Sequence, residues 1–136
     1  MPSILYNYWK RDVMNGTIDM DTNTFYVMLI NSSGVAAQDK DHQFRSTYTT
    51  YEVTGTGYTA GGAQLTSLVV SADLTNDLAY FDGADVSWAS ATVTARGAIV
   101  YKSNASTNGT PISGVCILSN PLHGPITQPS ELGATT

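Results

Sequence analysis

The sequence predicts a mainly β domain built from antiparallel strands, with a short N-terminal helix and an extended C-terminal arm. Charged residues make up 12% of the 136 residues, against a usual share of about 25%, and serine, threonine and glycine take their place. This composition is typical of strands and turns and not of long surface helices. From Thr49 onward, short apolar runs alternate with Gly, Asn and Asp at intervals of roughly ten residues, a pattern typical of antiparallel strands.

One helix is expected near the N-terminus. Its apolar and aromatic residues recur at the spacing of a helix face: Ile4, Leu5, Tyr8, Trp9 and Val13. Ser3 can cap the first turn, and Asn15-Gly16 can end the last one. A stripe of this kind more often covers a core than binds a ligand, so we expect the helix to pack against a sheet.

A central strand is expected at residues 24–30, because this nearly continuous apolar run must be covered on both faces. Residues 31–38 are expected to form a loop, and residues 39–48 one or two helical turns. Later strands are expected at residues 64–72, 78–81, 85–88, 92–101 and 112–118, with a turn at residues 73–77. We expect positive φ angles at Gly61 and Gly62, in a bulged or kinked connection.

The expected organisation is one β-rich domain over residues 1–118, followed by an arm over residues 119–136. The arm contains Pro121, Pro125 and Pro129 and lacks the periodicity of a strand or a helix. A proline-rich segment loses comparatively little conformational entropy when it becomes ordered. We therefore expect the arm to dock against a neighbouring subunit.

Charge and hydropathy exclude two classes of partner. The formal net charge is −5 and only six residues are lysine or arginine, so no basic stripe is available to neutralise the phosphates of a nucleic acid. No apolar run approaches the roughly 18 residues of a membrane-spanning helix, and the N-terminus lacks the charged-then-apolar order of a signal peptide. The single cysteine, Cys116, cannot form an internal disulfide and is expected to be an inert core thiol.

No catalytic residue and no cofactor site is expected. His42, His123 and Cys116 stand outside any recognisable catalytic motif, and neither G-x-S-x-G nor H-E-x-x-H occurs in the chain. The glycine-rich residues 55–62 precede a predicted strand and lack a lysine, whereas a phosphate-binding loop needs a helix after it. A kinked or bulged β connection is therefore expected there.

No metal site is expected either. Asp19, Asp21 and Asn23 have the spacing that opens a calcium-binding EF-hand loop, in which oxygens at alternate positions converge on the ion. The positions that need glycine and glutamate hold Thr24 and Ile30 instead. This pattern is better explained by a turn with side-chain acceptors.

Two blocks of the chain resemble a known family. They read YEVTGTGYTAGGAQL at residues 51–65 and DGADVSWASATVTARGAIVYK at residues 82–102, and they are similar to a family of small structural proteins encoded in the genomes of tailed bacteriophages. The similarity extends over roughly residues 3–118 and implies a virion component. Members of that family tend to close with a further strand, whereas this chain continues into Pro121-Leu122-His123-Gly124-Pro125.

The residues and the resemblance together predict a capsid decoration, or cement, protein that binds the outer lattice of the major capsid protein and stabilises it. The body is then expected to be a β-sandwich or jelly-roll-like domain, and the subunit a homo-oligomer such as a trimer. It is expected on the capsid surface of the virion, after synthesis in the host bacterial cytoplasm. Contacts with neighbouring subunits are expected from the helix, from exposed aromatic residues and from the arm: Tyr6, Trp9, Tyr48, Pro121, Leu122, Pro125, Ile126 and Pro129.

Three other functions stay open. The first is a tail, neck or fibre component of the same virion, which would have a lower copy number. The second is a carbohydrate-binding module, because sugars stack on exposed aromatic rings such as those of Tyr48, Tyr51, Tyr58 and Trp88. The third is an enzyme, which would need one of the two histidines within hydrogen-bond reach of a carboxylate.

Overall fold

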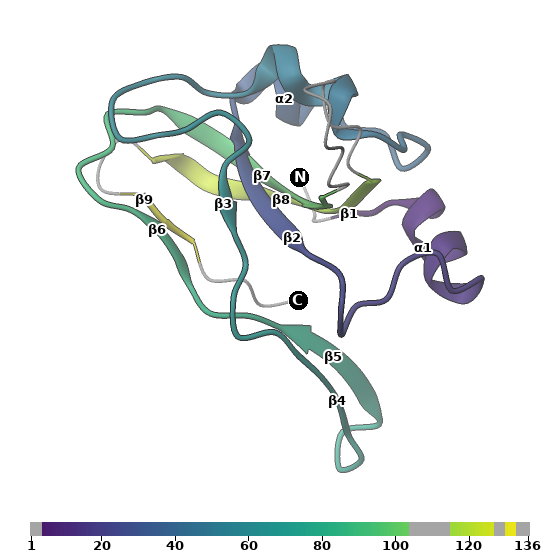
Figure 1. Ribbon diagram of the computed structural model, residues 1–136. Coiled ribbons are helices and arrows are strands. Elements are labelled where there is room, and N and C mark those ends of the chain that lie inside the picture. Colours follow the sequence, from purple (N-terminus) through teal and green to yellow (C-terminus); the bar gives the residue numbers. More distant parts are fainter. Residues whose placement is uncertain (1–3, 104–114, 127–129, 133–136) are drawn as a thin grey trace.

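The computed structural model describes the backbone of residues 4–103, 115–126 and 130–132, and the side chains of residues 4–103. Most of its secondary structure is strand, in antiparallel sheets, with a few short helices (Figure 1), which confirms the predicted fold class to that extent. Along the chain the elements are β1 (Ile4–Leu5), α1 (Asn7–Met14), β2 (Phe25–Ile30), α2 (Ser32–Ala36), the 3-10 helix η1 (Arg45–Tyr51), β3 (Ala63–Gln64), β4 (Val69–Asp73), β5 (Leu78–Asp82), β6 (Val86–Trp88), β7 (Ala95–Lys102), β8 (Val115–Ile126) and β9 (Ser130–Leu132).

A five-stranded antiparallel sheet forms the centre of the fold, in the order β1-β8-β7-β2-β3. β2 lies against β7 over its whole length, from the pair Phe25 and Lys102 to the pair Ile30 and Gly97. Every residue of β2 except Tyr26 is buried, as expected for an apolar strand that is covered on both faces. The predicted strand and its cover on both faces are confirmed, although the middle strand of the sheet is β7 and β2 lies next to it.

Both faces of this sheet carry a hydrophobic core, because successive side chains of a strand alternate between its faces. On one face, Phe25, Val27 and Leu29 pack with side chains from β6 and β7. On the other face, Met28 and Ile30 pack with side chains from α2 and η1. One strand therefore connects two separate core clusters.

The N-terminal helix α1 begins later than predicted. The first two described residues pair with β8 as the short strand β1, so the helix starts at Asn7, after an extended Tyr6 with φ −74° and ψ 138°. Ser3, the predicted cap, lies outside the described residues. The end of the helix is as predicted, since Asn15 caps it and Gly16 follows with a φ of +80°, a conformation that glycine adopts readily.

Two short helices occupy the region after β2. α2 forms where a loop was expected, and Asn31 caps it by accepting a hydrogen bond from the backbone N–H of Gly34 at 3.0 Å. η1 overlaps the end of residues 39–48, where helical turns were expected, and extends beyond them. Together they cover the core cluster on the second face of the sheet.

The connection from η1 to β3 passes very close to β2. Gly61 and Gly62 have φ angles of +95° and +81°, which confirms the predicted left-handed conformation. A Cβ added at Gly62 would overlap the carbonyl oxygen of Val27. Glycine therefore serves both the turn and the close approach of two backbones.

The segment after residue 118 differs from the predicted arm. Residues 115–126 form one strand, β8, between β7 and β1, and residues 130–132 form β9, which pairs with β6. The expected boundary between domain and arm thus falls inside a strand. β1 pairs with β8 only at residues 118 and 119, so among the described strands the rest of β8 has one free edge. Pro121 and Pro125 fit in β8 because a strand with a free edge tolerates a missing backbone N–H.

Candidate assembly surface

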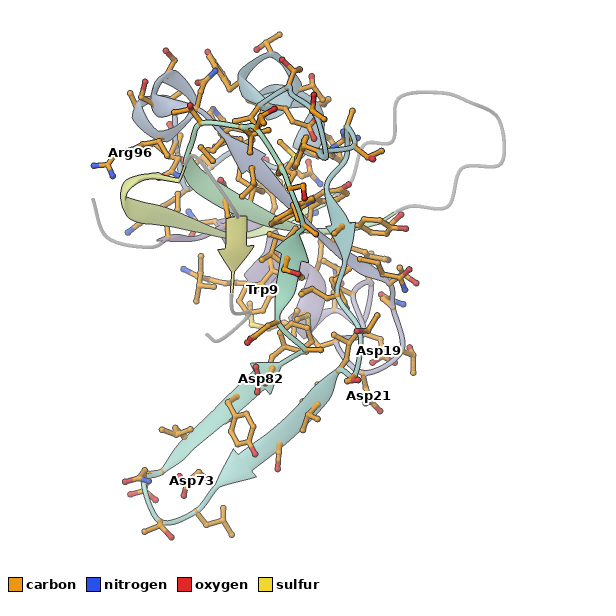
Figure 2. All side chains as sticks on the ribbon, turned by 90° about the vertical axis from the view of Figure 1, so that its left-hand side faces the viewer. Trp9, Asp19, Asp21, Asp73, Asp82 and Arg96 are labelled. Atoms are coloured by element: carbon orange, nitrogen blue, oxygen red, sulfur yellow. The ribbon has the colours of Figure 1, made fainter. Side chains whose placement is uncertain are left out.

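A β-hairpin made of β4 and β5 (residues 69–82) projects from the body of the fold (Figure 1). Its strands pair with each other from Val69 and Asp82 to Asp73 and Leu78, and with no other described strand. Figure 2 shows the same hairpin from another side, with Asp73 at its tip and Asp82 at its base. A two-stranded hairpin alone is marginally stable in water, so further contacts matter greatly for this element.

The β4–β5 hairpin exposes apolar side chains on both of its faces. Cross-strand partners share a face: one face carries Val70, Ala72, Ala79 and Phe81, and the other carries Val69, Ser71, Asp73, Leu78, Tyr80 and Asp82. The exposed fraction is 48% at Val69, 49% at Val70, 86% at Leu74, 48% at Leu78 and 38% at Tyr80. Contiguous apolar exposure of this kind marks a site of interaction.

The tip of the hairpin is a turn held by Asp73. Its carboxylate accepts hydrogen bonds from the backbone N–H groups of Thr75 at 2.9 Å and Asn76 at 3.2 Å, and from the side-chain amide of Asn76 at 2.7 Å. These hydrogen bonds hold the pKa of Asp73 below its ordinary value of 3.8, and the one from the Asn76 side chain has the largest effect. The turn presents the exposed Leu74 at the tip.

We expect acid to loosen this turn. A carboxylate whose pKa is lowered by folding stabilises the folded form above its ordinary pKa, and this stabilisation is lost as the pH falls through the lowered value. The amide chemical shifts of Thr75 and Asn76, followed by NMR, should therefore titrate with a midpoint below 3.8. In Asp73→Asn, which keeps an acceptor but does not titrate, they should stay constant. A titration that persists in that variant would assign the effect to another carboxylate.

The base of the hairpin is fixed to the core. Phe81 packs edge-on against the buried Phe25, with ring centroids 5.5 Å apart and an angle of 67° between the planes. The backbone N–H of Ala84 donates to the carbonyl of Thr66 at 2.8 Å and closes the hairpin just below its strands. The hairpin is therefore anchored at one end and free at the other.

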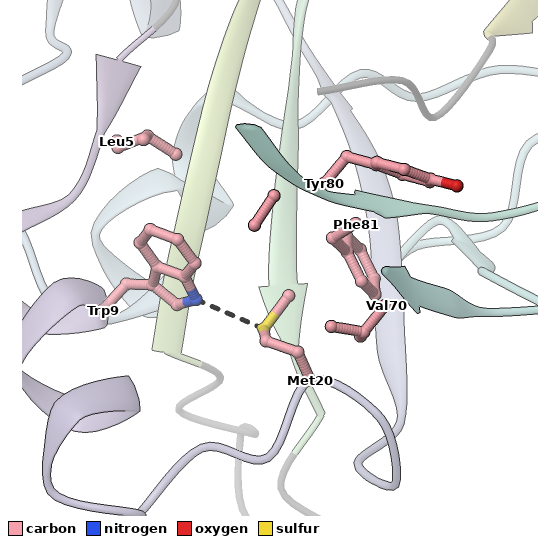
Figure 3. Close-up of a pocket in the computed structure, with 7 residues that line it drawn as sticks. Leu5, Trp9, Met20, Val70, Tyr80 and Phe81 are labelled. Atoms are coloured by element: carbon pink, nitrogen blue, oxygen red, sulfur yellow. Dashed lines mark hydrogen bonds between the residues drawn. The ribbon is translucent and has the colours of Figure 1, made fainter. Parts of the chain in front are cut away.

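An apolar pocket of about 420 Å³ lies between the base of the hairpin and α1 (Figure 3). It is lined by Leu5, Trp9, Met20, Val70, Ala79, Tyr80 and Phe81. The indole N–H of Trp9 donates to the sulfur of Met20 at 3.4 Å, which connects the two side chains across the pocket. Because Val70 and Phe81 belong to one hairpin face, the pocket continues that face, and we call the hairpin and the pocket together the assembly surface.

Trp9 is the predicted contact residue that lies on this surface. Tyr6 and Tyr48 were expected to be exposed anchors, and this expectation is wrong, because both side chains have an exposed fraction of 0%. Their rings lie edge to face, with centroids 6.2 Å apart, in the core cluster on the second face of the sheet. They are core residues that join the start of α1 and η1 to the sheet.

The predicted contacts in the C-terminal segment lie where the structure describes no side chains. Pro121, Leu122, Pro125 and Ile126 belong to β8, of which the structure describes the backbone only. Pro129 lies outside the described residues. Their role as assembly contacts stays a prediction.

The aromatic residues considered for sugar binding form no exposed platform. Tyr48 is fully buried and Trp88 is 6% exposed. Tyr58 lies against Trp88, with ring centroids 5.7 Å apart, and the half-buried Tyr51 packs against the second core cluster. The two buried rings cannot stack on a sugar, and the other two are only partly exposed.

A buried polar network surrounds Glu52, and no pattern in the sequence predicts it. Oε1 of Glu52 accepts from the hydroxyl of Tyr58 at 2.8 Å and from the backbone N–H of Gly61 at 2.6 Å, while Oε2 pairs with the guanidinium of Arg45 at 3.2 Å. The hydroxyl of Tyr58 accepts in turn from the N–H of Leu29 at 3.0 Å. The pKa of Tyr58 lies above its ordinary value of 10.0, mainly because the hydroxyl is buried and also because the Glu52 carboxylate is close to it. The network ties the glycine-rich connection to β2.

In the described part of the chain, the side chains considered for catalysis and metal binding do not come together in a catalytic or metal-binding site. Nδ1 of His42 lies 2.7 Å from the hydroxyl of Tyr48, and the side chains of His123 and Cys116, in β8, lie outside those described. Within the described residues, no three His, Cys, Asp or Glu side chains gather in a group that could hold a metal ion. The described helices include none that is long and apolar enough to cross a membrane.

Comparison of the chain with protein-family models, with curated proteins and with solved structures gives no match. Because a fold alone does not determine a function, the properties of the assembly surface bear most directly on what this protein does.

Proposed function

We propose that this chain is a structural protein of a tailed-bacteriophage virion, and that it is a capsid decoration, or cement, protein on the outer lattice of the major capsid protein. The observation that carries the proposal is the projecting β4–β5 hairpin, which leaves apolar side chains exposed on both faces. A surface of this kind is stabilised when another protein covers it. The resemblance of residues 51–65 and 82–102 to phage structural proteins supports the class of assembly.

A lattice suits a small subunit with one projecting contact. A stable protein interface buries in total about 1,000 Å² or more. Simultaneous contacts with several lattice subunits add avidity, so that weak single contacts suffice. In this proposal the subunit is a homo-oligomer such as a trimer, so that several hairpins reach the lattice at once.

The proposal includes two finer features of the fold. The body is a β-sandwich or jelly-roll-like domain, which the antiparallel sheets and the core on both faces of β2 support. The segment after residue 118 contributes contacts with neighbouring subunits, in addition to its strand pairing with β7. Both features belong to a protein that works by assembly and not by catalysis.

The copy number in purified virions tests the proposal. A decoration protein occupies equivalent positions of the lattice, so quantitative gel densitometry should give a fixed ratio to the major capsid protein. A count that fits a single ring of the tail or neck would instead support the tail, neck or fibre alternative. Absence of the chain from purified particles would contradict any structural role in the virion.

A further inference from the structure

The β4–β5 hairpin is acidic as well as apolar. Residues 69–82 contain three of the eleven acidic residues of the chain and none of its six lysines and arginines: Asp73, Asp77 and Asp82. Asp73 and Asp77 flank the turn that presents Leu74, and Asp82 ends β5 at the base of the hairpin. Any partner that covers the exposed leucines of this hairpin must also face these carboxylates.

We propose that the β4–β5 hairpin is the element that fastens the subunit, and that it docks into an apolar groove bordered by lysine and arginine side chains on a different protein. This inference rests on the proposed function and states the chemistry of the partner. Leu74 and Leu78 enter the groove, and the aspartates at the tip pair with basic residues at its edge. Apolar side chains of the same partner fill the pocket beside Trp9.

A second copy of this chain fits the hairpin poorly. Two hairpins that met tip to tip would bring Asp73 and Asp77 of one copy against the same residues of the other, and like charges repel each other. The pocket of a second copy is no better, because Met20 in its wall stands between Asp19 and Asp21, both of which are exposed. Figure 2 shows these two residues and Asp82 near the base of the hairpin. Both arrangements bring aspartate carboxylates of two copies close together. Electrostatic repulsion therefore favours a different protein, and not a second copy, as the partner of the hairpin.

The inference is tested by binding to particles that were assembled without this protein. The test variant is the double substitution Leu74→Ser and Leu78→Ser, and the matched control is Met14→Ser. Met14 is 82% exposed on α1, close to the 86% of Leu74, and it lies outside the assembly surface. In cosedimentation we expect the double variant to bind at least about tenfold more weakly than the unmodified chain, because burial of the two leucines together contributes a factor of at least about ten. Met14→Ser should bind normally.

A second pair of variants tests the charge. Asp77→Asn removes one negative charge at the tip and keeps a residue that tolerates the φ of +54° found there. Asp41→Asn removes one charge outside the hairpin and keeps the side-chain oxygen that accepts from Asn7 at 2.7 Å. Asp77→Asn should bind more weakly at low salt and lose part of the salt dependence of binding, because an ion pair with the partner is gone. Asp41→Asn should change neither the affinity at low salt nor the salt dependence of binding.

The outcomes separate this inference from the proposed function. If the unmodified chain binds the particles and the double variant binds equally well, the inference is wrong while the proposed function stands. If the unmodified chain does not bind at all, the proposed function fails and the inference with it. If analytical ultracentrifugation shows an oligomer that the double variant dissociates to monomers, a second copy occupies the hairpin, and the inference is overturned.

Discussion

Replacement of Tyr48 by alanine should destabilise the fold by about 3–5 kcal/mol, a large share of the roughly 5–15 kcal/mol that stabilises a typical domain. The ring of Tyr48 is fully buried and lies edge-on to Tyr6. Its hydroxyl lies 2.7 Å from Nδ1 of His42 and accepts from the N–H of Asp39 at 3.5 Å. Alanine removes the ring and the hydroxyl together and leaves a cavity that the packed neighbours cannot fill completely.

Urea unfolding measured by circular dichroism checks this expectation. Tyr48→Phe is the matched control, since it keeps the ring and removes only the hydroxyl, and its cost should be about 1–2 kcal/mol. The free energy of unfolding should therefore be slightly lower for Tyr48→Phe than for the unmodified chain, and much lower for Tyr48→Ala. An unchanged midpoint for Tyr48→Ala would contradict the burial of this ring and restore Tyr48 as a candidate surface anchor.

The parts of the fold that were predicted correctly are those that depend on neighbouring residues. The apolar run of β2 requires cover on both faces, wherever that cover comes from. Asn15 and Gly16 end α1, and Gly61 and Gly62 adopt positive φ, because the backbone preferences of these residue types are local. No knowledge of distant contacts is needed for either prediction.

The exposure of single aromatic residues depends on contacts between distant parts of the chain. Tyr6 and Tyr48 lie far apart in the sequence and meet only when η1 and the start of α1 fold over the same face of the sheet. Nothing in the residues around either tyrosine indicates that meeting. The network around Glu52 was missed for the same reason, because Leu29 and Gly61 contact it from separate segments.

The predicted strand at residues 112–118 overlaps the start of β8, but its continuation to residue 126 was not expected, because whether a strand tolerates proline depends on its position within the sheet. Pro121 and Pro125 argue against a strand that has partners on both sides, and they are compatible with a strand that has a free edge. Whether an edge is free depends on where β1 stops pairing, which is at residues 118 and 119. The sequence of β8 alone does not contain this information.

The candidate site was predictable in part. The expected strands at residues 64–72 and 78–81 and the turn between them overlap β4 and β5. The projection of the hairpin was not expected. Val69 and Val70 are consecutive, so they lie on opposite faces, and such a pattern normally indicates a strand covered on both faces. An apolar pattern on both faces of a hairpin that the fold leaves in solvent is itself an indication that another protein covers it.

Replacement of Glu52 by glutamine should also destabilise the fold by about 3–5 kcal/mol, because it leaves the Arg45 guanidinium buried without a counter-charge. The side chains of Arg45 and Glu52 are only 12% and 7% exposed. Glutamine can still accept from Tyr58 and Gly61 through its oxygen, but its NH₂ group then faces Arg45, so that two donors oppose each other. Urea unfolding at neutral pH measures the loss.

A double-mutant cycle with Arg45→Met separates the ion pair from the rest of the network. Removal of both charges should cost less than the sum of the single changes, with a coupling on the order of 0.5–3 kcal/mol, because neither partner is then left buried alone. Arg45 also stacks on Tyr101, with its guanidinium carbon 5.2 Å from the ring centroid, and methionine keeps much of that packing. A coupling near zero would mean that Tyr58 and Gly61 alone offset the burial of Glu52, and that the ion pair does not hold the glycine-rich connection against β2.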